Sequence, residues 1–183
     1  MVDAALAGGV DAVQLREKDL SGAALLALAC RLRDVTRRYG ARLLVNDRVD
    51  IALACDADGV HLPADSFAPA DARRLLGQHR LLGASTHSVE QAQAAAAGGA
   101  DFIVFGPVFE TPSKRAFGTP VGLEAVAQVA HAVLQPVLAI GGLTAERVAS
   151  VLQCGARGVA VVAAILEADD PRGAAAELRA ALA

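Results

Sequence analysis

Charged and amide side chains close two short apolar segments near the start of the chain. Arg16 and Lys18 follow the first of these segments, and Asn46 and Asp47 follow the second. A guanidinium and an ammonium group suit the oxygen atoms of a diphosphate, and a carboxylate is a preferred ligand of Mg²⁺. A single charged triplet is usually a solvated loop, but the two segment ends together predict a site for Mg²⁺ and a diphosphate.

Two more side chains extend this predicted site. Gln14 lies two residues before Arg16, and the alternation of side chains along a strand places both on one side. Asp47 is the predicted carboxylate ligand of Mg²⁺, and Asp65, which comes after the next apolar segment, is the candidate for a second ligand. Asp65 also suits a turn or a helix N-cap, because it stands in the sequence Pro-Ala-Asp-Ser.

A histidine lies in a comparable position later in the chain. Ser85 and His87 belong to the run Ser-Thr-His-Ser, which ends another apolar segment. Imidazole titrates near neutral pH, so His87 is a candidate general acid or base. A histidine at such a position is equally often a structural hydrogen-bonding group. The sequence around His61 and His131 indicates no chemical role.

A long connection over residues 109–120 contains hydroxyl groups and two cationic side chains. Thr111, Ser113 and Lys114 can bind an anion through hydroxyls, backbone amides and an ammonium group. A connection of this length is typical of an active-site lid, although a plain connecting loop has a similar composition.

Two glycines and the end of the last apolar segment indicate a phosphate site. Gly141 and Gly142 end one segment, and Val162 and Ala163 end the next. In barrels of parallel strands, the loops after the last two strands commonly bind phosphate through backbone amides. The glycine pair alone is a weak signal, and the two segment ends together predict binding of a phosphorylated small molecule.

The elements that must position these residues follow a regular order. Apolar segments of strand length alternate with alanine-rich segments of helical periodicity. This alternation predicts a parallel sheet covered on both faces. The seven predicted strands are residues 12–17, 42–47, 59–63, 81–86, 102–108, 137–142 and 158–163.

The polar residues decide between two parallel architectures. An open doubly wound sheet gathers its ligand-binding groups at one switch point, whereas a (β/α)₈ barrel gathers them from many strand ends on one face. Polar or glycine residues end most of the predicted strands here, so we expect an α/β fold of the (β/α)₈ TIM-barrel type. With seven strands, the first strand of the barrel is expected to be missing from this chain. An open sheet that is complete as it stands is the alternative.

The composition excludes several classes of protein. The chain has 183 residues, a formal net charge of −3 and 54% hydrophobic residues, which predicts a single globular domain over residues 1–183. The sequence has no basic stripe and no apolar run of about 20 residues, so neither nucleic acid nor a membrane is an expected partner. The three cysteines stand far apart, which predicts no disulfide and no zinc site and favours a cytoplasmic location. The apolar faces of the alanine-rich helices suit either core packing or a homodimer.

Seven short motifs occur in order along the chain: QLREK, NDRVDIAL, ADGVHL, STHS, FGPVFETPSK, AIGG and GVAVVAAI. Together they resemble the thiamine phosphate synthase/TenI family over nearly the whole chain. The resemblance implies a (β/α)₈ barrel and small phosphorylated heterocycles as substrates. It also implies one of two activities, a synthase or a tautomerase. The synthase couples hydroxymethylpyrimidine diphosphate to hydroxyethylthiazole phosphate with Mg²⁺, through a pyrimidine cation that the thiazole nitrogen attacks.

The resemblance further implies roles for individual residues. Arg16, Lys18 and Lys114 would stabilise the departing diphosphate, and Asp47 would bind the metal. The pyrimidine diphosphate would contact residues 14–18, Asn46, Ser85 and Lys114. The thiazole phosphate would contact Thr111, Pro112, Ser113, Gly142, Val162 and Ala163.

Two positions depart from the synthase pattern. Ser66 stands where the second metal-binding aspartate of the family falls, one position after Asp65, and Ala163 replaces a serine of the thiazole-phosphate site. These changes are similar to the tautomerase branch, in which a histidine at the position of His87 is the acid and base and no metal is needed. The intact QLREK and ND motifs favour the synthase. A ligand-binding protein without turnover is a third hypothesis.

Overall fold

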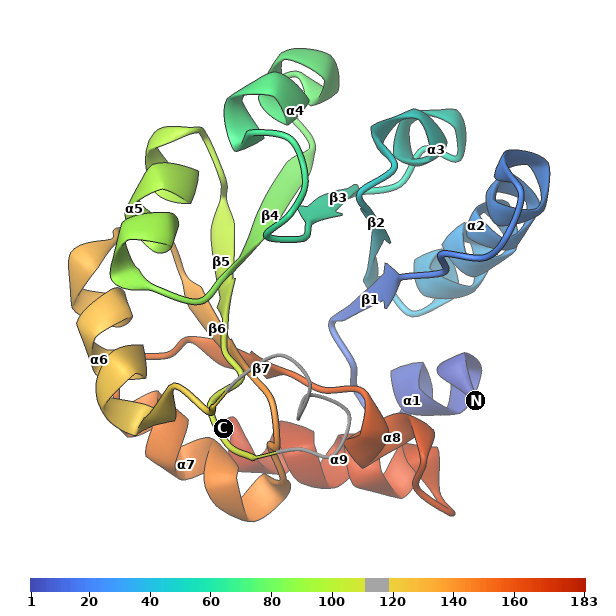
Figure 1. The fold of residues 1–183 in the computed structure, drawn as a ribbon. Helices are drawn as coiled ribbons and strands as arrows, with labels where there is room; N and C mark the ends of the chain where they lie inside the picture. The colour runs from blue at the N-terminus through green and yellow to red at the C-terminus, as the bar shows by residue number, and fades with distance from the viewer. Residues whose placement is uncertain (111–118) are drawn as a thin grey trace.

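The central element of the fold is a parallel sheet whose strands follow one another in sequence order. The computed structural model describes residues 1–110 and 119–183. The strands are β1 (Ala12–Leu15), β2 (Arg42–Asn46), β3 (Gly59–Leu62), β4 (Leu81–Thr86), β5 (Phe102–Phe105), β6 (Val137–Ile140) and β7 (Gly158–Ala160). Each strand pairs in parallel with the next. Figure 1 shows the sheet curling with the helices on its outer side, so the carboxyl ends of the strands lie on one rim.

Helices follow the strands and cover the outer side of the curled sheet. The described helices are α1 (Val2–Ala7), α2 (Gly22–Arg38), α3 (Val49–Ala54), α4 (Pro69–Leu76), α5 (Val89–Ala97), α6 (Gly122–Ala132), α7 (Ala145–Gln153), α8 (Ala163–Leu166) and α9 (Pro171–Ala181). Ser21 and Ser88 cap α2 and α5, because each serine hydroxyl accepts a hydrogen bond from a backbone N–H of the first helical turn. None of the helices in the two described ranges is long and apolar enough to cross a membrane.

The sheet is a curled half-barrel, which confirms the seven predicted strands and the barrel type of architecture. Strands β1 and β7 are its two edges, and no pairing between them is recorded within residues 1–110 and 119–183. Helix α1 packs against α9 beside these edges, as Figure 1 shows.

Every predicted strand begins at the residue where the observed strand begins, and β4 also ends where predicted. The other six strands end one to three residues early. At these ends the chain turns out of the ladder: Asp47 has a φ of 65° and Gly141 a φ of 101°, and Pro107 has no N–H to donate. The residues that end the strands are therefore free to face a ligand.

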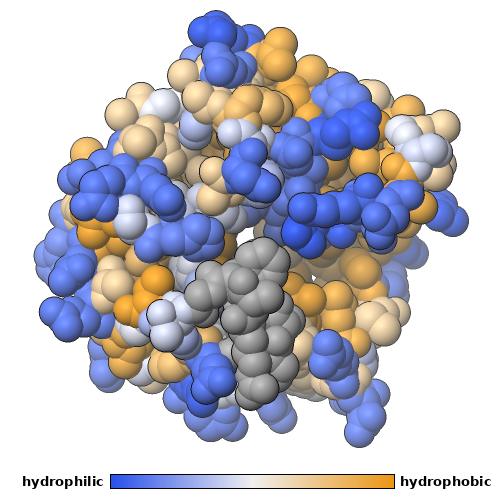
Figure 2. Space-filling model, viewed as in Figure 1, coloured by the Kyte–Doolittle hydropathy of each residue, from blue (hydrophilic) through white to orange (hydrophobic). Residues whose placement is uncertain are grey.

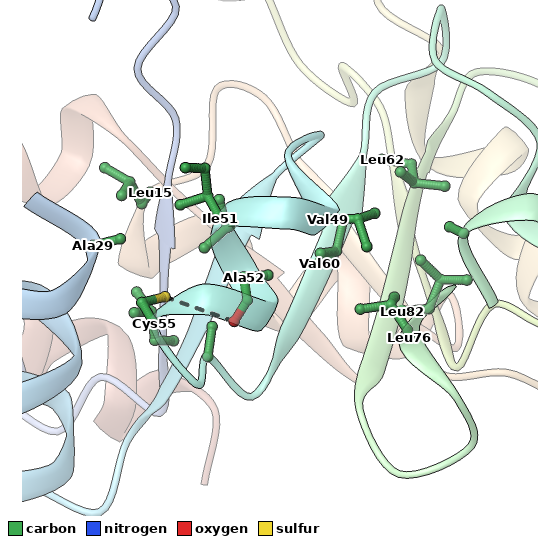
Figure 3. Close-up of a cluster of buried hydrophobic side chains, with 14 of the residues drawn as sticks. Leu15, Ala29, Val49, Ile51, Ala52, Cys55, Val60, Leu62, Leu76 and Leu82 are labelled. Atoms are coloured by element: carbon green, nitrogen blue, oxygen red, sulfur yellow. Dashed lines mark hydrogen bonds between the residues drawn. The ribbon is translucent and has the colours of Figure 1, made fainter. Parts of the chain in front are cut away.

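Buried apolar side chains fix the positions of the strands. Leu15 of β1, Val60 of β3 and Leu82 of β4 belong to one cluster with Ile51 of α3 and Leu76 of α4, as Figure 3 shows. A second cluster joins β5 and β6 to α5, α6 and α7. Each large side chain buried in this way contributes about 1.5–3 kcal/mol to the stability of the fold. The strands that carry the rim residues are therefore held firmly in place.

Aspartates hold the amino ends of the strands. Asp58, just before β3, accepts hydrogen bonds from the Leu43 amide at 2.7 Å and from Arg33 at 2.6 Å. Asp101, just before β5, accepts one from the Leu82 amide at 2.7 Å. These stabilising contacts lie at the opposite end of the sheet from the predicted site, so the rim residues are not needed for them.

Candidate functional site

The described residues of the predicted site all lie at or after the carboxyl ends of parallel strands and therefore share one rim. They are Gln14, Arg16 and Lys18 at β1, Asn46 and Asp47 at β2, Asp65 after β3, Ser85 and His87 at β4, Gly141 and Gly142 after β6, and Val162 and Ala163 after β7. Thr111, Pro112, Ser113 and Lys114 lie outside the described residues. Figure 2 shows that this face is hollowed near its centre and that hydrophilic residues gather around the loop after β1.

His61 of β3 links three of the predicted side chains. Gln14 Nε2 lies 3.1 Å from Asn46 Oδ1 and 2.7 Å from His61 Nδ1. The other ring nitrogen, Nε2, lies 3.3 Å from Ser85 Oγ. An amide NH₂ group can only donate, so Nδ1 accepts and the proton on Nε2 is donated to Ser85. One hydrogen-bonded network thus joins β1, β2, β3 and β4.

The ring of His61 is held neutral and in a fixed orientation. The residue is 6% exposed, and burial lowers the pKa of its imidazole to about 4. The ring stacks on Phe102 with the centroids 6.2 Å apart. Gly83 makes room for Phe102, because a Cβ at that position would lie 2.1 Å from the phenyl ring. The side chains of Gln14 and Ser85 are therefore oriented before any ligand arrives.

The sequence interpretation of His61 as an ordinary residue was incomplete. The sequence did contain a signal for the role of His61, because a histidine in a buried strand must find hydrogen-bond partners. All four residues of β3 are buried. The strand register supplied the rest: His61 pairs with Asn46 of the neighbouring strand.

His61 should make the stability of the fold depend on pH. Its pKa is about 4 in the folded chain and about 6.5 in the unfolded chain, so the unfolded chain binds the proton first as the pH falls. The stabilising contribution is complete above about pH 6.5 and is lost as the pH falls toward about 4. From this residue alone, the free energy of unfolding in denaturant should fall by about 2 kcal/mol between about pH 7.5 and about pH 5.

Two variants isolate this contribution. His61→Asn is expected to remove it, whereas His79→Gln, at an exposed position, should keep it. If both proteins showed the same pH dependence, burial would not be the cause of a neutral His61 ring.

Asp47 is held in place by its backbone and by Ser66. Its N–H donates to the His61 carbonyl at 3.0 Å, and the Ser66 hydroxyl donates to its Oδ1 atom. Asp65 is exposed, and the described part of the chain records no contact between it and Asp47. Ser66, rather than Asp65, is the neighbour of the predicted metal ligand.

Arg16 and Lys18 are exposed on the rim. No ion pair is recorded for either residue within residues 1–110 and 119–183, whereas Arg33, Arg48 and Arg73 each bind an aspartate. The charges of Arg16 and Lys18 are therefore available to an anionic ligand.

His87 is exposed at the end of β4 and has a defined orientation. Its Nδ1 atom contacts the carbonyl oxygen of Gly106, which can only accept, so Nδ1 carries a proton and the lone pair of the neutral ring is on Nε2. The backbone N–H of His87 donates to Oε1 of Gln91 in α5 at 2.7 Å, and Ser88 caps the N-terminus of α5. This arrangement leaves Nε2 able to accept a proton from a ligand.

The glycine pair after β6 is braced by an arginine. Arg147 donates to the Gly142 carbonyl at 2.6 Å and lies over the Phe109 ring, with its guanidinium carbon 4.7 Å from the centroid. Gly142 has a φ of 63°, and a Cβ there would lie 2.7 Å from the carbonyl oxygen of Glu110. Only glycine fits this position, where the half-buried backbone of the loop packs closely against Phe109 and Glu110.

Comparison with known proteins agrees, over most of the chain, with the family that the sequence motifs resemble. Residues 1–165 match the family described as thiamine monophosphate synthase. A thiamine-phosphate synthase from Roseiflexus castenholzii is 51% identical over 175 residues, which cover 95% of this chain and 76% of the relative. A thiamine-phosphate synthase from Chloroflexus aurantiacus is 46% identical over 180 residues, covering 98% of this chain and 83% of the relative.

A solved structure agrees with this likeness. The thiamine phosphate pyrophosphorylase from Pyrococcus furiosus superposes with a TM-score of 0.91 at 38% identity, covering 99% of this chain and 87% of that protein. A 3-hexulose-6-phosphate synthase superposes with a TM-score of 0.69 at 24% identity, which shows the shared fold alone.

Proposed function

Since the chain belongs to the thiamine monophosphate synthase family, we propose that it is a transferase that couples hydroxymethylpyrimidine diphosphate with hydroxyethylthiazole phosphate. The products are thiamine phosphate and diphosphate. One observation carries the proposal: the network of Gln14, His61 and Ser85 lies on the same rim as the two cations Arg16 and Lys18. Fixed neutral hydrogen-bonding groups beside exposed cations suit a neutral heteroaromatic ring that carries a diphosphate.

The proposed reaction breaks one bond and forms another at the same carbon. The bond between the methylene carbon of the pyrimidine and a diphosphate oxygen breaks, and the thiazole nitrogen then bonds to that carbon. Gln14 and Ser85 would hold the pyrimidine ring, while Arg16 and Lys18 would stabilise the charge that develops on the departing diphosphate. Backbone amides beside Gly142 would hold the phosphate of the thiazole.

The donor set at Asp47 fits a Mg²⁺ ion that is shared with the substrate. Mg²⁺ is usually bound through one or two carboxylates, with phosphate and water oxygens completing its shell. Residues 1–110 and 119–183 contain no group of three or more His, Cys, Asp or Glu side chains that could hold a metal by themselves, so Asp47 would share the ion with the diphosphate. When bound, Mg²⁺ would neutralise charge on the leaving group.

A product assay with both substrate pairs, in the presence and absence of Mg²⁺, tests the proposal. The expected result is Mg²⁺-dependent formation of thiamine phosphate. Stabilisation of the fold by the substrates without any product would instead indicate a ligand-binding protein. Proton exchange on a thiazole carboxylate phosphate without coupling would indicate a tautomerase.

The orientation of His87 favours the tautomerase as the second candidate. Its Nδ1 proton is directed to the Gly106 carbonyl, so Nε2 is free to act as a base and then return the proton as an acid. This reaction would need neither the diphosphate site nor Mg²⁺.

The two activities should respond differently to one substitution. If tautomerisation occurs, His87→Ala should slow it about 100-fold or more, because it removes the base, while coupling should change by less than about threefold, since the proposed coupling step does not use this side chain. NMR of the thiazole proton and the yield of thiamine phosphate measure the two rates. His131→Ala is the matched control, and equal losses of both activities in His87→Ala would show that His87 has a structural role.

Partners and location are also proposed. The cysteines Cys30, Cys55 and Cys154 are all free thiols, which supports a reducing, cytoplasmic environment. We propose small phosphorylated heterocycles as the partners, with no nucleic acid or membrane, and a homodimer through exposed helix faces. Light scattering of the purified protein measures the oligomeric state.

A further inference from the structure

Ser66 connects two neighbouring strand ends at the rim. It lies in the connection between β3 and α4, and its hydroxyl donates to Oδ1 of Asp47 in the connection after β2. Both side chains are half-buried. The hydrogen bond between Ser66 and Asp47 is therefore partly shielded from solvent.

The backbone of Asp47 is held by hydrogen bonds on both sides of the residue. The residue has a φ of 65°, its N–H donates to the His61 carbonyl at 3.0 Å, and its carbonyl accepts from the Val49 amide at 3.1 Å. Only the side-chain torsions of Asp47 are left to be fixed, and the bond from Ser66 fixes them.

The neighbouring Arg48 is hydrogen-bonded to another carboxylate, although its charge also interacts with that of Asp47. Arg48 Nε and Nη2 bind the two carboxylate oxygens of Asp50 at 2.8 and 2.6 Å. In the described part of the chain, Oδ2 of Asp47 has no recorded hydrogen bond or ion pair. One oxygen of Asp47 is thus held by Ser66, and the other is available to a cation.

We infer that Ser66 is a positioning residue for a divalent cation at Asp47. Its hydroxyl holds Oδ1 and leaves Oδ2 of Asp47 to the ion. This inference rests on the proposed function, because that function brings Mg²⁺ to Asp47. A site with one protein carboxylate binds the free ion weakly, so the cation and the diphosphate should bind cooperatively.

Direct binding of Mn²⁺ tests this role without turnover. Mn²⁺ is titrated by EPR into the protein, alone and with inorganic diphosphate. Ser66→Ala should weaken Mn²⁺ binding about tenfold in the presence of diphosphate, as loss of a group that orients a metal ligand usually does. Ser66→Thr keeps the hydroxyl and should bind Mn²⁺ as the unaltered chain does. Ser66→Asp adds a carboxylate and should tighten binding of Mn²⁺ alone.

The outcomes separate this inference from the proposed function. Unfolding in denaturant shows whether Ser66→Ala retains a stable fold, and Asp65→Ala is the matched control that should leave Mn²⁺ binding unchanged. If Asp47→Asn abolished Mn²⁺ binding and Ser66→Ala left it unchanged, the role of Ser66 would be wrong and the metal site would stand. If Asp47→Asn also left Mn²⁺ binding unchanged, the metal site of the proposed function would fail as well.

Discussion

Asp47→Asn should lower kcat/KM for the coupling reaction about 100- to 1,000-fold and remove its dependence on Mg²⁺. The reason is electrostatic: the substitution removes the carboxylate that Ser66 holds at the rim and that the proposed mechanism places on a cation shared with the leaving diphosphate. Asparagine is the preferred replacement, because Asp47 has a φ of 65° and asparagine tolerates the left-handed region better than alanine does. Initial rates of thiamine phosphate formation over a Mg²⁺ titration measure the effect.

The control for this prediction is Asp65→Ala, which removes an exposed carboxylate one residue before Ser66. It should leave the rate and its Mg²⁺ dependence unchanged. A loss as large as that of Asp47→Asn would restore Asp65 as the second metal ligand and would require the connection after β3 to rearrange on binding. An Asp47→Asn protein with the full coupling rate would remove the metal from the mechanism.

The fold was predictable from the sequence because its signals are local. Each strand begins at or next to the start of an apolar run, so the starts of β1 to β7 were found correctly. Six of the seven ends were placed too late, because residues such as Gly106 and Gly142 extend the run in sequence after the ladder has stopped. Backbone hydrogen bonds between neighbouring strands decide where a strand ends. The hydrophobic periodicity of the sequence carries no information about these bonds.

The site was predictable only in part, for the same physical reason. Gln14, Asn46 and Ser85 were identified from their types and their positions at strand ends. His61 joins them through the register of β1 to β4, which the sequence alone does not specify. Likewise, the choice between Asp65 and Ser66 depends on a shift of one residue in a loop, and the structure places Ser66 against Asp47.

Lys18→Ala is the second substitution with a large expected effect. Lys18 is exposed on the rim, and the proposed mechanism places its ammonium group against the departing diphosphate. Removing it should lower kcat/KM about 100-fold or more, since a preorganised positive charge at a leaving group typically contributes this much. Lys18→Arg keeps the charge but not the compact ammonium geometry, so it should recover part of the rate.

Arg31→Ala is the control for charge alone. Arg31 is exposed on α2, so this variant has the same net charge as Lys18→Ala and should retain the full coupling rate. Equal losses in Lys18→Ala and Arg31→Ala would mean that the overall charge of the chain, and not a specific contact at the rim, determines the rate.

Chemical protection tests the contact between Lys18 and diphosphate without catalysis. The chain contains two lysines, Lys18 and Lys114, so acetylation of each is resolved by mass spectrometry. Inorganic diphosphate with Mg²⁺ should slow acetylation of Lys18, because an ammonium group bound to an anion is a poor nucleophile. Unchanged acetylation of Lys18 at saturating diphosphate would place the anion elsewhere and would contradict the role assigned to the loop after β1.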